Sequence, residues 1–386
     1  MRVLFLLDNL DAGGAERNTL DLMRALIGLS VEPHLCIAGR RCDERLLAEA
    51  IALGARVHRL HGARLYDPRP LLRLARLLSR ERFDVVHLQD PYPAPMAFLA
   101  SLVFGIPVVT TRHVLADDHS NIRADVRSRL LLRVMRAASD RIILPAARLR
   151  TPFAEQSGIS PGRMVVVHNG IVSRPLVEGA RDLLRRQLGW RPEERIILIV
   201  ALLRGGKGHE DLFAAMPQIL QASPGARLKV VGDGRERARL EALASPLGEA
   251  VAFLGMRSDV PDLMSAADLL VLPSWSEAYP TVLLEAAMAG LPSVTTDVGG
   301  AAEIVVDGET GLVVPPRSPD SLAQAIIGIV EDEQRLRSLG SAARRVAIER
   351  FTIERQARAT LDVYRDLMGE RLAAALRGGR RSGLPA

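Results

Sequence analysis

Short runs of aliphatic and β-branched residues alternate along the chain with longer segments of helical periodicity. This alternation is typical of βαβ units, in which parallel strands form a sheet and the connecting helices cover its faces. In the first half the expected strands span 2–7, 33–38, 56–59, 84–88, 107–110, 141–144 and 164–167. In the second half they span 195–201, 227–231, 251–254, 269–272, 293–295 and 312–314. The pattern therefore predicts an α/β protein built on parallel sheets.

The length of the chain and an internal similarity indicate two domains. A chain of 386 residues is too long for one ordinary domain. Both halves open with an apolar strand, a paired-glycine turn and a helix, the turns being Gly13-Gly14 and Gly205-Gly206. We predict two Rossmann-like, doubly wound domains that face each other across a cleft, spanning 1–174 and 175–353. A last helix, about 354–376, can pack back on the first domain, and 377–386 is expected to be a disordered basic tail.

The positive charge of the chain is concentrated in its first half. Residues 1–175 hold 25 arginines and 17 acidic residues, a net charge of +8, and the whole chain holds 51 basic and 45 acidic residues, so the remainder carries −2. Four arginines of the expected helix 68–82, Arg69, Arg73, Arg76 and Arg80, share one side. Such a helix can contact anionic lipid, or it can be an ordinary sheet-covering helix with a charged outer side. Nucleic acid is not expected as a partner, because only 4% of residues are aromatic and none interleave with these arginines.

Targeting signals and cysteine content indicate in which cellular compartment the protein is expected. The first apolar run ends at Asp8 and is too short for a signal-peptide core, and no stretch approaches the roughly twenty apolar residues of a membrane span. Cys36 and Cys42 are too few for a disulfide framework. We expect a cytoplasmic protein, with peripheral contact to the inner face of the cell membrane as an open alternative.

Two glutamates and two cations stand where open α/β folds bind ligands, at the carboxyl ends of expected strands. Glu277 and Glu285 lie eight residues apart between the strand 269–272 and a helix, and Arg204 and Lys207 follow the strand 195–201. Acids can accept hydrogen bonds from sugar hydroxyls, and cations can hold a diphosphate, so together they fit an activated-sugar site. The alternatives are a solvated loop for the cations and surface acids for the glutamates.

The spacing of the glutamates does not suggest a glycoside-hydrolase pair. Residues eight apart on a helix would be separated by about 12 Å along its axis. A retaining hydrolase needs its carboxyl groups about 5–5.5 Å apart and an inverting one about 6.5–9.5 Å. Separate roles are therefore expected, with Glu285 near a ribose diol and Glu277 near the transferred sugar.

The glycine-rich turns are not standard phosphate loops. Lys207 is followed by Gly208, where a Walker loop needs Ser or Thr, and the turn at Gly13-Gly14 lacks the third glycine of a dinucleotide fingerprint. A strand-to-helix turn still presents backbone N–H groups to an anion. For Gly13 and Gly14 the alternative is a tight turn that needs positive φ.

His113 is the candidate histidine, because it directly follows the expected strand 107–110. There it can donate to a sugar hydroxyl or share a developing charge, although a lone histidine is a weak signal. No metal-ligand set and no Gly-x-Ser-x-Gly elbow is found in the sequence.

Several short motifs in a particular order resemble the family 4 retaining glycosyltransferases of the GT-B fold. They are Gly13-Gly-Ala-Glu-Arg17, Thr111-Arg-His113, His168-Asn-Gly170, Lys207-Gly-His209, Val231-Gly-Asp-Gly234, Phe253-Leu-Gly255, Glu277 with Glu285, Val298-Gly-Gly300 and Asp307-Gly-Glu-Thr-Gly311. The resemblance runs nearly end to end.

The resemblance implies transfer of a sugar from a nucleotide-diphosphate donor with retained anomeric configuration, and no required metal or cofactor. The first domain would bind a glycan or lipid-linked acceptor and the second the donor, in the synthesis of a bacterial surface polysaccharide or glycolipid. Arg204 and Lys207 would hold the diphosphate, Glu285 the ribose and Glu277 the donor sugar, with Thr281 and Val282 in the same donor site. His113 would lie at the reacting centre, and Gly13 and Gly14 would bring backbone close to phosphate and acceptor.

Two positions depart from the family pattern. Leu202 stands five residues before Lys207, where the family often has arginine, and Pro280 stands where many members have glycine. Loops 90–95 and 115–121 are expected to help select the substrates. Two alternatives stay open: a nucleotide-sugar epimerase or phosphorylase on the same scaffold, and a non-catalytic carbohydrate-binding protein.

Overall fold

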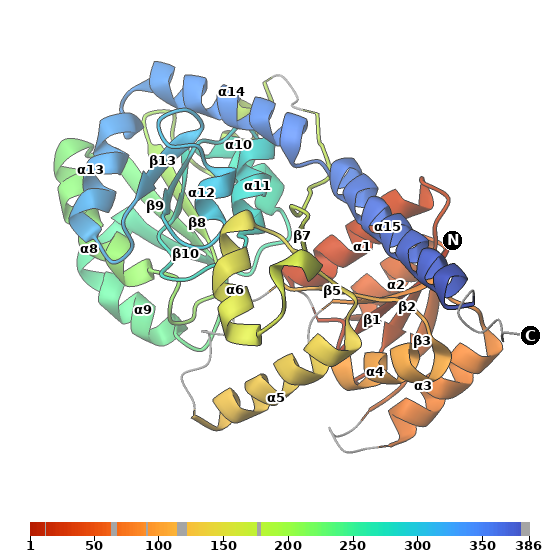
Figure 1. Cartoon of the computed structure of the whole chain (residues 1–386). Helices are drawn as coiled ribbons and strands as arrows, with labels where there is room; N and C mark the ends of the chain where they lie inside the picture. The colour runs from red at the N-terminus through yellow and green to blue at the C-terminus, as the bar shows by residue number, and fades with distance from the viewer. Residues whose placement is uncertain (12, 63–67, 90–91, 114–121, 176–178, 380–386) are drawn as a thin grey trace, which may run out of the picture. The chain divides into compact units, whose positions relative to one another are not determined.

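The structure is a computed structural model of the whole chain, and it describes residues 1–11, 13–62, 68–89, 92–113, 122–175 and 179–379. The chain divides into two compact units (Figure 1). The N-terminal unit comprises Met1–Gly170 and the C-terminal segment from Ile353, and the C-terminal unit comprises Ile171–Thr352. Each is described by itself below.

A parallel sheet of seven strands, in the order β3-β2-β1-β4-β5-β6-β7, forms the centre of the N-terminal unit. Its inner strands read as continuous apolar runs, because helices cover both faces of a parallel sheet and leave no solvated face. Val3 to Leu7 of β1, for example, are all nearly inaccessible to solvent. The strands are β1 (Arg2–Leu7), β2 (Glu32–Ile37), β3 (Arg56–Arg59), β4 (Val85–Leu88), β5 (Val108–Thr111), β6 (Arg141–Leu144) and β7 (Met164–Val166).

Helices cover this sheet from both sides, with α1 and α15 on one face and α3, α4 and α5 on the other (Figure 1). In α3 the sequence pattern shows why: Leu74 and Leu78 are buried, whereas the four arginines of its other side are exposed. The helices are α1 (Gly14–Ile27), α2 (Glu44–Ala52), α3 (Arg69–Arg80), α4 (Ala94–Phe104), α5 (Ile122–Ala138), α6 (Arg150–Ser157) and α15 (Ile353–Gly379).

Buried hydrogen bonds attach α15 to the N-terminal unit. The side-chain amides of Asn18 in α1 and Gln356 in α15 bond to each other in both directions, at 2.9 and 3.1 Å. Gly170 shares the network, since its N–H donates to Gln356 Oε1 at 2.7 Å and its carbonyl accepts from Asn18. Further along α15, the Tyr364 hydroxyl lies 2.6 Å from Nδ1 of the buried His87 on β4. Because these polar groups are buried, each would cost free energy if it lost its partner.

The C-terminal unit contains a parallel sheet of six strands in the order β10-β9-β8-β11-β12-β13. This is the strand order of a doubly wound fold, with the reversal between β8 and β11. The strands are β8 (Arg195–Val200), β9 (Ala226–Val231), β10 (Val251–Gly255), β11 (Leu269–Leu272), β12 (Ser293–Thr296) and β13 (Gly311–Val314).

Helices again lie on both faces of this sheet, α8 packing with α13 on one side and α11 with α14 on the other (Figure 1). They are α7 (Ala180–Gln187), α8 (His209–Ala222), α9 (Arg237–Ala244), α10 (Val260–Ala266), α11 (Thr281–Met288), α12 (Ala301–Ile304), α13 (Pro319–Val330) and α14 (Glu333–Arg350).

The predicted fold class, two parallel-sheet α/β domains, is confirmed, and every predicted strand lies within one residue of an observed one. The chain passes between units at Gly170/Ile171 and Thr352/Ile353, where the prediction placed 174/175 and 353/354. The last helix continues to Gly379, so residues 377–379, predicted as disordered tail, are helical. Residues 380–386, the loop 115–121 and residues 90–91 of the loop 90–95 lie outside the described residues. Within the described part of the chain, no helix has both the length and the apolar content needed to cross a membrane.

Candidate functional site

The loops that follow β8 and β11 lie side by side at the carboxyl edge of the C-terminal sheet. The two strands pair in parallel, Ile197 with Leu269 and Leu198 with Leu270. The loop after β8 leads to α8 and the loop after β11 leads to α11, and these helices lie on opposite faces of the sheet, so the strand order reverses between the two strands. Such a switch point opens a crevice for ligands outside the carboxyl ends of the strands. The loops 201–208 and 273–280 therefore meet here.

Lys207 and Glu277 form an ion pair between these two loops. Lys207 Nζ lies 2.6 Å from Glu277 Oε1, and the Ser274 hydroxyl donates to the same oxygen at 2.7 Å. Only 14% of the Lys207 side chain and 12% of the Glu277 side chain is exposed. Short charge-assisted hydrogen bonds of this kind are stronger than neutral ones and fix the geometry of both groups.

Two glycines allow the loops to approach this closely. Gly208 has φ +70°, and a β-carbon there would stand 1.9 Å from the carbonyl oxygen of Pro273. Gly299, after β12, has φ +47°, and a β-carbon there would stand 1.7 Å from the carbonyl oxygen of Glu277. Both residues occupy the left-handed region and touch backbone, which cannot move aside as a flexible side chain can. Glycine is therefore required at both positions to hold Glu277 beside Lys207.

Trp275 fastens the β11 loop to the neighbouring elements. Its indole N–H donates to Asp211 Oδ2 in α8 at 2.7 Å, and its backbone N–H donates to the Gly206 carbonyl at 2.8 Å. The Arg317 guanidinium stacks over the indole ring at 4.3 Å from its centroid. This cation–π contact and the two hydrogen bonds hold the segment that carries Ser274 and Glu277.

The helix α11 begins immediately after the Glu277 loop. Thr281 and Val282 occupy its first two positions and Glu285 its fifth, all three half-buried. N–H groups in the first turn of a helix have no acceptor within the helix and can bind an anion or a hydroxyl. Pro280 precedes the helix at the N-cap and has no N–H to offer.

Arg204 lies in the same loop as Lys207, with a half-buried side chain. Its backbone N–H donates to the Leu202 carbonyl at 2.8 Å, closing a tight turn. The structure thus places Arg204, Lys207, Glu277, Thr281, Val282 and Glu285 on loops and a helix end at one edge of one sheet.

Gly13, Gly14 and His113 belong to the N-terminal unit, again at the carboxyl edge of its sheet. Gly13 caps α1 with φ −123°, and Gly14 is the first residue of that helix. The alternative of a tight turn requiring positive φ at Gly13 is therefore wrong. A β-carbon at Gly13 would stand 2.4 Å from the Glu16 carboxylate, so the glycine leaves room for that acid.

His113 follows β5, and its Nε2 lies 2.8 Å from Oε1 of Gln89, the residue that follows β4. Because an amide oxygen only accepts, His113 Nε2 carries the proton and Nδ1 is an acceptor. Burial, assisted by the neighbouring Arg112 charge, lowers the pKa of His113 to about 4. The imidazole is thus neutral at pH 7.

Sequence reasoning missed the residues that orient the predicted ones. Ser274 and Trp275 hold the Glu277 loop, and Gln89 positions His113. The available signal was that these three residues lie one to three positions after a strand. Serine and glutamine are common at such positions, so this signal did not single them out. Among the described residues, the carboxyl-edge loops contain no group of three metal-ligating side chains.

Comparison with known proteins identifies the family. Residues 12–173 match the family described as Glycosyltransferase Family 4, and residues 180–346 match the one described as Glycosyl transferases group 1. A glycogen synthase of Mycobacterium tuberculosis is 32% identical over 73% of this chain and 69% of its own length. An N-acetyl-alpha-D-glucosaminyl L-malate synthase of Bacillus anthracis is 28% identical over 78% of this chain and 80% of its own.

Solved structures show the same fold. The Anabaena protein HepE, in complex with UDP, superposes with a TM-score of 0.82 at 23% identity, over 95% of this chain and 100% of that one. A sucrose-phosphate synthase of Thermosynechococcus elongatus superposes with a TM-score of 0.80 at 22% identity, over 96% and 100%.

The fold is that of a two-domain glycosyltransferase of the GT-B type. The chain belongs to the family 4 glycosyltransferases, as the motif order predicts.

The loop of Lys207 offers a matched pair of glycine substitutions. We expect Gly208→Ala to lower sugar transfer by at least about tenfold, because the added β-carbon displaces the Pro273 backbone and with it Glu277. Gly205→Ala should leave transfer within about twofold, because no atom lies within 4 Å of the position its β-carbon would occupy. Steady-state kinetics of both purified variants checks this, and equal rates would show that the loop contact is not needed.

Buried neutral histidines should make the protein sensitive to acid. Burial lowers the pKa of His87 to about 3 and that of His113 and His209 to about 4, from an ordinary value near 6.5. Between pH 6.5 and 4 the unfolded chain therefore binds more protons than the folded one, and the free energy of unfolding falls as pH falls, by up to about 1.4 kcal/mol per pH unit per histidine.

His209→Leu isolates one of these groups. Both ring nitrogens of His209 are buried and have no hydrogen-bond partner among the residues that the structure describes, so leucine should not lower the melting temperature at pH 7.5. At pH 5 the variant should melt above the wild type. Scanning fluorimetry at both pH values measures the two melting temperatures. If the difference between variant and wild type were the same at pH 7.5 and at pH 5, His209 would not be a buried neutral histidine.

Proposed function

We propose that this glycosyltransferase moves a sugar from a nucleotide-diphosphate donor to a glycan or lipid-linked acceptor, with retention of configuration and without a metal ion. The donor binds at the carboxyl edge of the C-terminal sheet, and the N-terminal unit contributes acceptor contacts. The observation that carries the proposal is the Lys207–Glu277 pair, held by Ser274 at the switch point between β8 and β11.

Lys207 and Glu277 can both form hydrogen bonds to a donor without breaking their ion pair. A lysine ammonium has three hydrogens, and one of them meets Glu277. A carboxylate offers about four acceptor positions, and Lys207 and Ser274 use Oε1. Lys207 can therefore donate to a phosphate oxygen while Glu277 Oε2 accepts from hydroxyls of the sugar attached to it. Arg204 adds a second cation on the same loop, and Glu285 in α11 supplies an acceptor for ribose hydroxyls.

This arrangement suits a reaction that needs charge stabilisation more than a protein nucleophile. The bond between the anomeric carbon and the diphosphate oxygen breaks while the acceptor oxygen bonds to the same face of that carbon. The acceptor proton passes to the departing diphosphate. Lys207 and Arg204 stabilise the charge that develops on the diphosphate, which is the role elsewhere filled by a metal ion. His113 acts through its unprotonated Nδ1, as a hydrogen-bond acceptor near the sugar.

The relatives support the donor class and a role in surface glycan synthesis. HepE has been crystallised with UDP, with UDP and glucose, and with UDP-glucose. Other proteins of this fold include a lipopolysaccharide outer core galactosyltransferase, which supports a role in surface glycan synthesis.

Glu277→Gln and Lys207→Met separate the two proposed roles. Glutamine keeps an oxygen for Ser274 but removes the charge, so UDP alone should bind at least as tightly as to the wild type, while transfer falls by about a hundredfold. Lys207→Met should weaken UDP binding and also lower transfer by about a hundredfold. Calorimetry with UDP measures the binding, and a product assay with nucleotide sugars measures the transfer. Glu285→Gln should also reduce the affinity for the donor.

Lys229→Met is the control, because Lys229 is the other lysine of the chain and lies within β9 rather than in the loops. NMR of the product should show the donor's anomeric configuration, and EDTA should not change the initial rate. An inverted product, donor turnover without acceptor, or glycan binding without nucleotide binding would each contradict the proposal.

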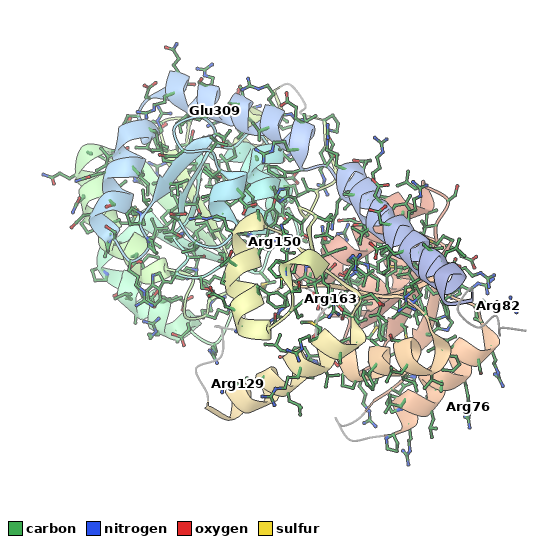
Figure 2. All side chains as sticks on the ribbon, in the orientation of Figure 1. Arg76, Arg82, Arg129, Arg150, Arg163 and Glu309 are labelled. Atoms are coloured by element: carbon green, nitrogen blue, oxygen red, sulfur yellow. The ribbon has the colours of Figure 1, made fainter. Side chains whose placement is uncertain are left out.

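We further propose that the N-terminal unit contacts an anionic membrane surface through α3 and α4. The four arginines of α3 are exposed, and Figure 2 shows Arg76 on the outer side of this helix. On the adjacent α4, Leu102 and Val103 are each 65% exposed and Phe98 is 38% exposed. Cations beside exposed apolar side chains match the headgroup and acyl regions of a bilayer surface. A peripheral cytoplasmic location fits this surface.

Removal of two of these charges should weaken vesicle binding. Arg76→Gln with Arg80→Gln should reduce affinity for phosphatidylglycerol-containing vesicles about ten- to thirtyfold, at roughly 1 kcal/mol per cation. Arg186→Gln with Arg358→Gln removes the same charge from exposed positions of other helices and should change affinity little. Co-sedimentation measures vesicle binding. Equal losses of affinity in the two double variants would exclude a membrane-binding surface localised to α3 and α4.

A further inference from the structure

A cluster of two histidines and a glutamate lies at the edge of the N-terminal sheet. His34 is on β2, His58 is on the edge strand β3, and Glu81 is the C-cap of α3. His34 Nδ1 lies 3.0 Å from His58 Nε2 and 3.7 Å from Glu81 Oε2, and the three atoms all fall within 4.8 Å of one another. The cluster is formed by the middle of β2 and β3, not by the carboxyl-edge loops.

Two of the separations between these atoms are close to those of metal ligands. Ligand atoms of a tetrahedral Zn²⁺, with bonds of about 2.0–2.2 Å, lie about 3.3–3.6 Å apart. The observed 3.0 and 3.7 Å bracket that range. The imidazole planes are nearly parallel, 9° apart, with centroids separated by 5.3 Å. Because the two nitrogens are 3.0 Å apart while the centroids are 5.3 Å apart, the two imidazole rings meet edge to edge and do not stack face to face.

Two further observations point to a bound cation. Glu81 Oε2 is a buried atom that has no hydrogen-bond partner in the described part of the chain, although His34 Nδ1 and the Arg56 guanidinium each lie 3.7 Å from it. The other ring nitrogen of His34, Nε2, lies 3.2 Å from Glu32 Oε1. A carboxylate on the far nitrogen is the outer-shell arrangement that orients metal-binding histidines and raises their basicity. His34 is also fixed by Phe83, whose ring meets it edge-on at 4.9 Å between centroids.

We propose that His34 Nδ1, His58 Nε2 and Glu81 Oε2 bind one Zn²⁺ ion, with water as the fourth ligand and Glu32 orienting His34. Two imidazoles and one carboxylate form a borderline ligand set that suits Zn²⁺ better than Mg²⁺ or Ca²⁺. Because His34 Nε2 donates to Glu32, His34 Nδ1 accepts the Nε2–H of His58. When the ion binds, the His58 proton moves from Nε2 to Nδ1 and the ring turns, so that the Nε2 lone pair points to the ion. His58 and Glu81 are partly exposed, which gives the ion an entry path.

The site must tolerate one nearby cation. The Arg56 guanidinium lies 3.7 Å from Glu81 Oε2 and 3.8 Å from Glu32 Oε1. Its side chain is 60% exposed, so it can move into solvent when the ion binds. Arg2, on the other side, pairs with Glu32 at 3.0 Å and leaves the ligand atoms clear.

The role of this ion is structural. Among the described strands, the edge strand β3 pairs with β2 alone, and metal bonds from His58 and Glu81 would tie it to β2 and to the end of α3. The ion takes no part in sugar transfer, so its removal should lower the melting temperature without changing the initial rate at low temperature. The proposal is independent of the donor site.

Titration of the full-length protein with zinc chloride after chelator treatment tests the site. We expect one Zn²⁺ per chain with micromolar or tighter affinity, a rise of several degrees in melting temperature, and a visible absorption band when Co²⁺ is used instead. His58→Asn and Glu81→Gln should each abolish the stoichiometric site. Glu32→Gln should weaken it about 10- to 100-fold, as expected for an outer-shell partner. These partly exposed positions are preferred to the buried His34, whose replacement would threaten folding.

His61→Asn is the matched control, because His61 is exposed near β3 and outside the cluster, and asparagine tolerates its φ of +52°. It should bind Zn²⁺ like the wild type. Absence of zinc binding by the wild type, or undiminished binding by His58→Asn and Glu81→Gln, would overturn the proposal and identify the cluster as a hydrogen-bond and ion-pair network alone.

Discussion

The parallel pairing of β8 with β11 is the constraint on which the donor-site geometry depends. It brings together two loops whose key residues, Lys207 and Glu277, are seventy positions apart in the sequence. A salt bridge alone would not hold the loops, because its net contribution to stability is small once both charges are desolvated. The strands, the backbone contacts at Gly208 and Gly299, and the anchoring of Trp275 hold them, and the ion pair forms within that frame.

The Lys207–Glu277 pair also explains how opposite charges can share a partly buried site. Either charge alone would be costly in a place with little solvent, whereas the pair is neutral as a whole. Each partner keeps unused hydrogen-bonding capacity in a fixed direction. A ligand with a negative part joined to a hydroxylated part is complementary to that arrangement, because it can bind both partners at once. Preorganised charge of this kind stabilises a departing anion without reorganisation during the reaction.

Two buried histidines of the N-terminal unit are positioned by neutral polar contacts, whereas the edge loops of the C-terminal unit hold an ion pair. His87 and His113 are kept neutral by burial and are positioned by hydroxyl and amide groups. The last helix, α15, completes this unit through the amide network of Asn18 and Gln356, although the whole second sheet separates the two residues in the sequence. The C-terminal helix is therefore part of the first unit's core and not an appendage.

The amino-acid sequence by itself determined the fold class and the strand positions to within one residue, and it predicted the loops that carry the proposed donor-site residues. Those properties follow from local patterns, since hydrophobic periodicity and strand-end motifs need no knowledge of distant contacts. Tertiary structure alone decided which distant partners the predicted residues have: Lys207 for Glu277, Gln89 for His113, and the convergence of His34, His58 and Glu81. The structure also shows that Gly13 needs no positive φ. The distant pairings depend on strand order and register, which place atoms from separate segments within 4.8 Å of each other and leave no periodic trace in the sequence.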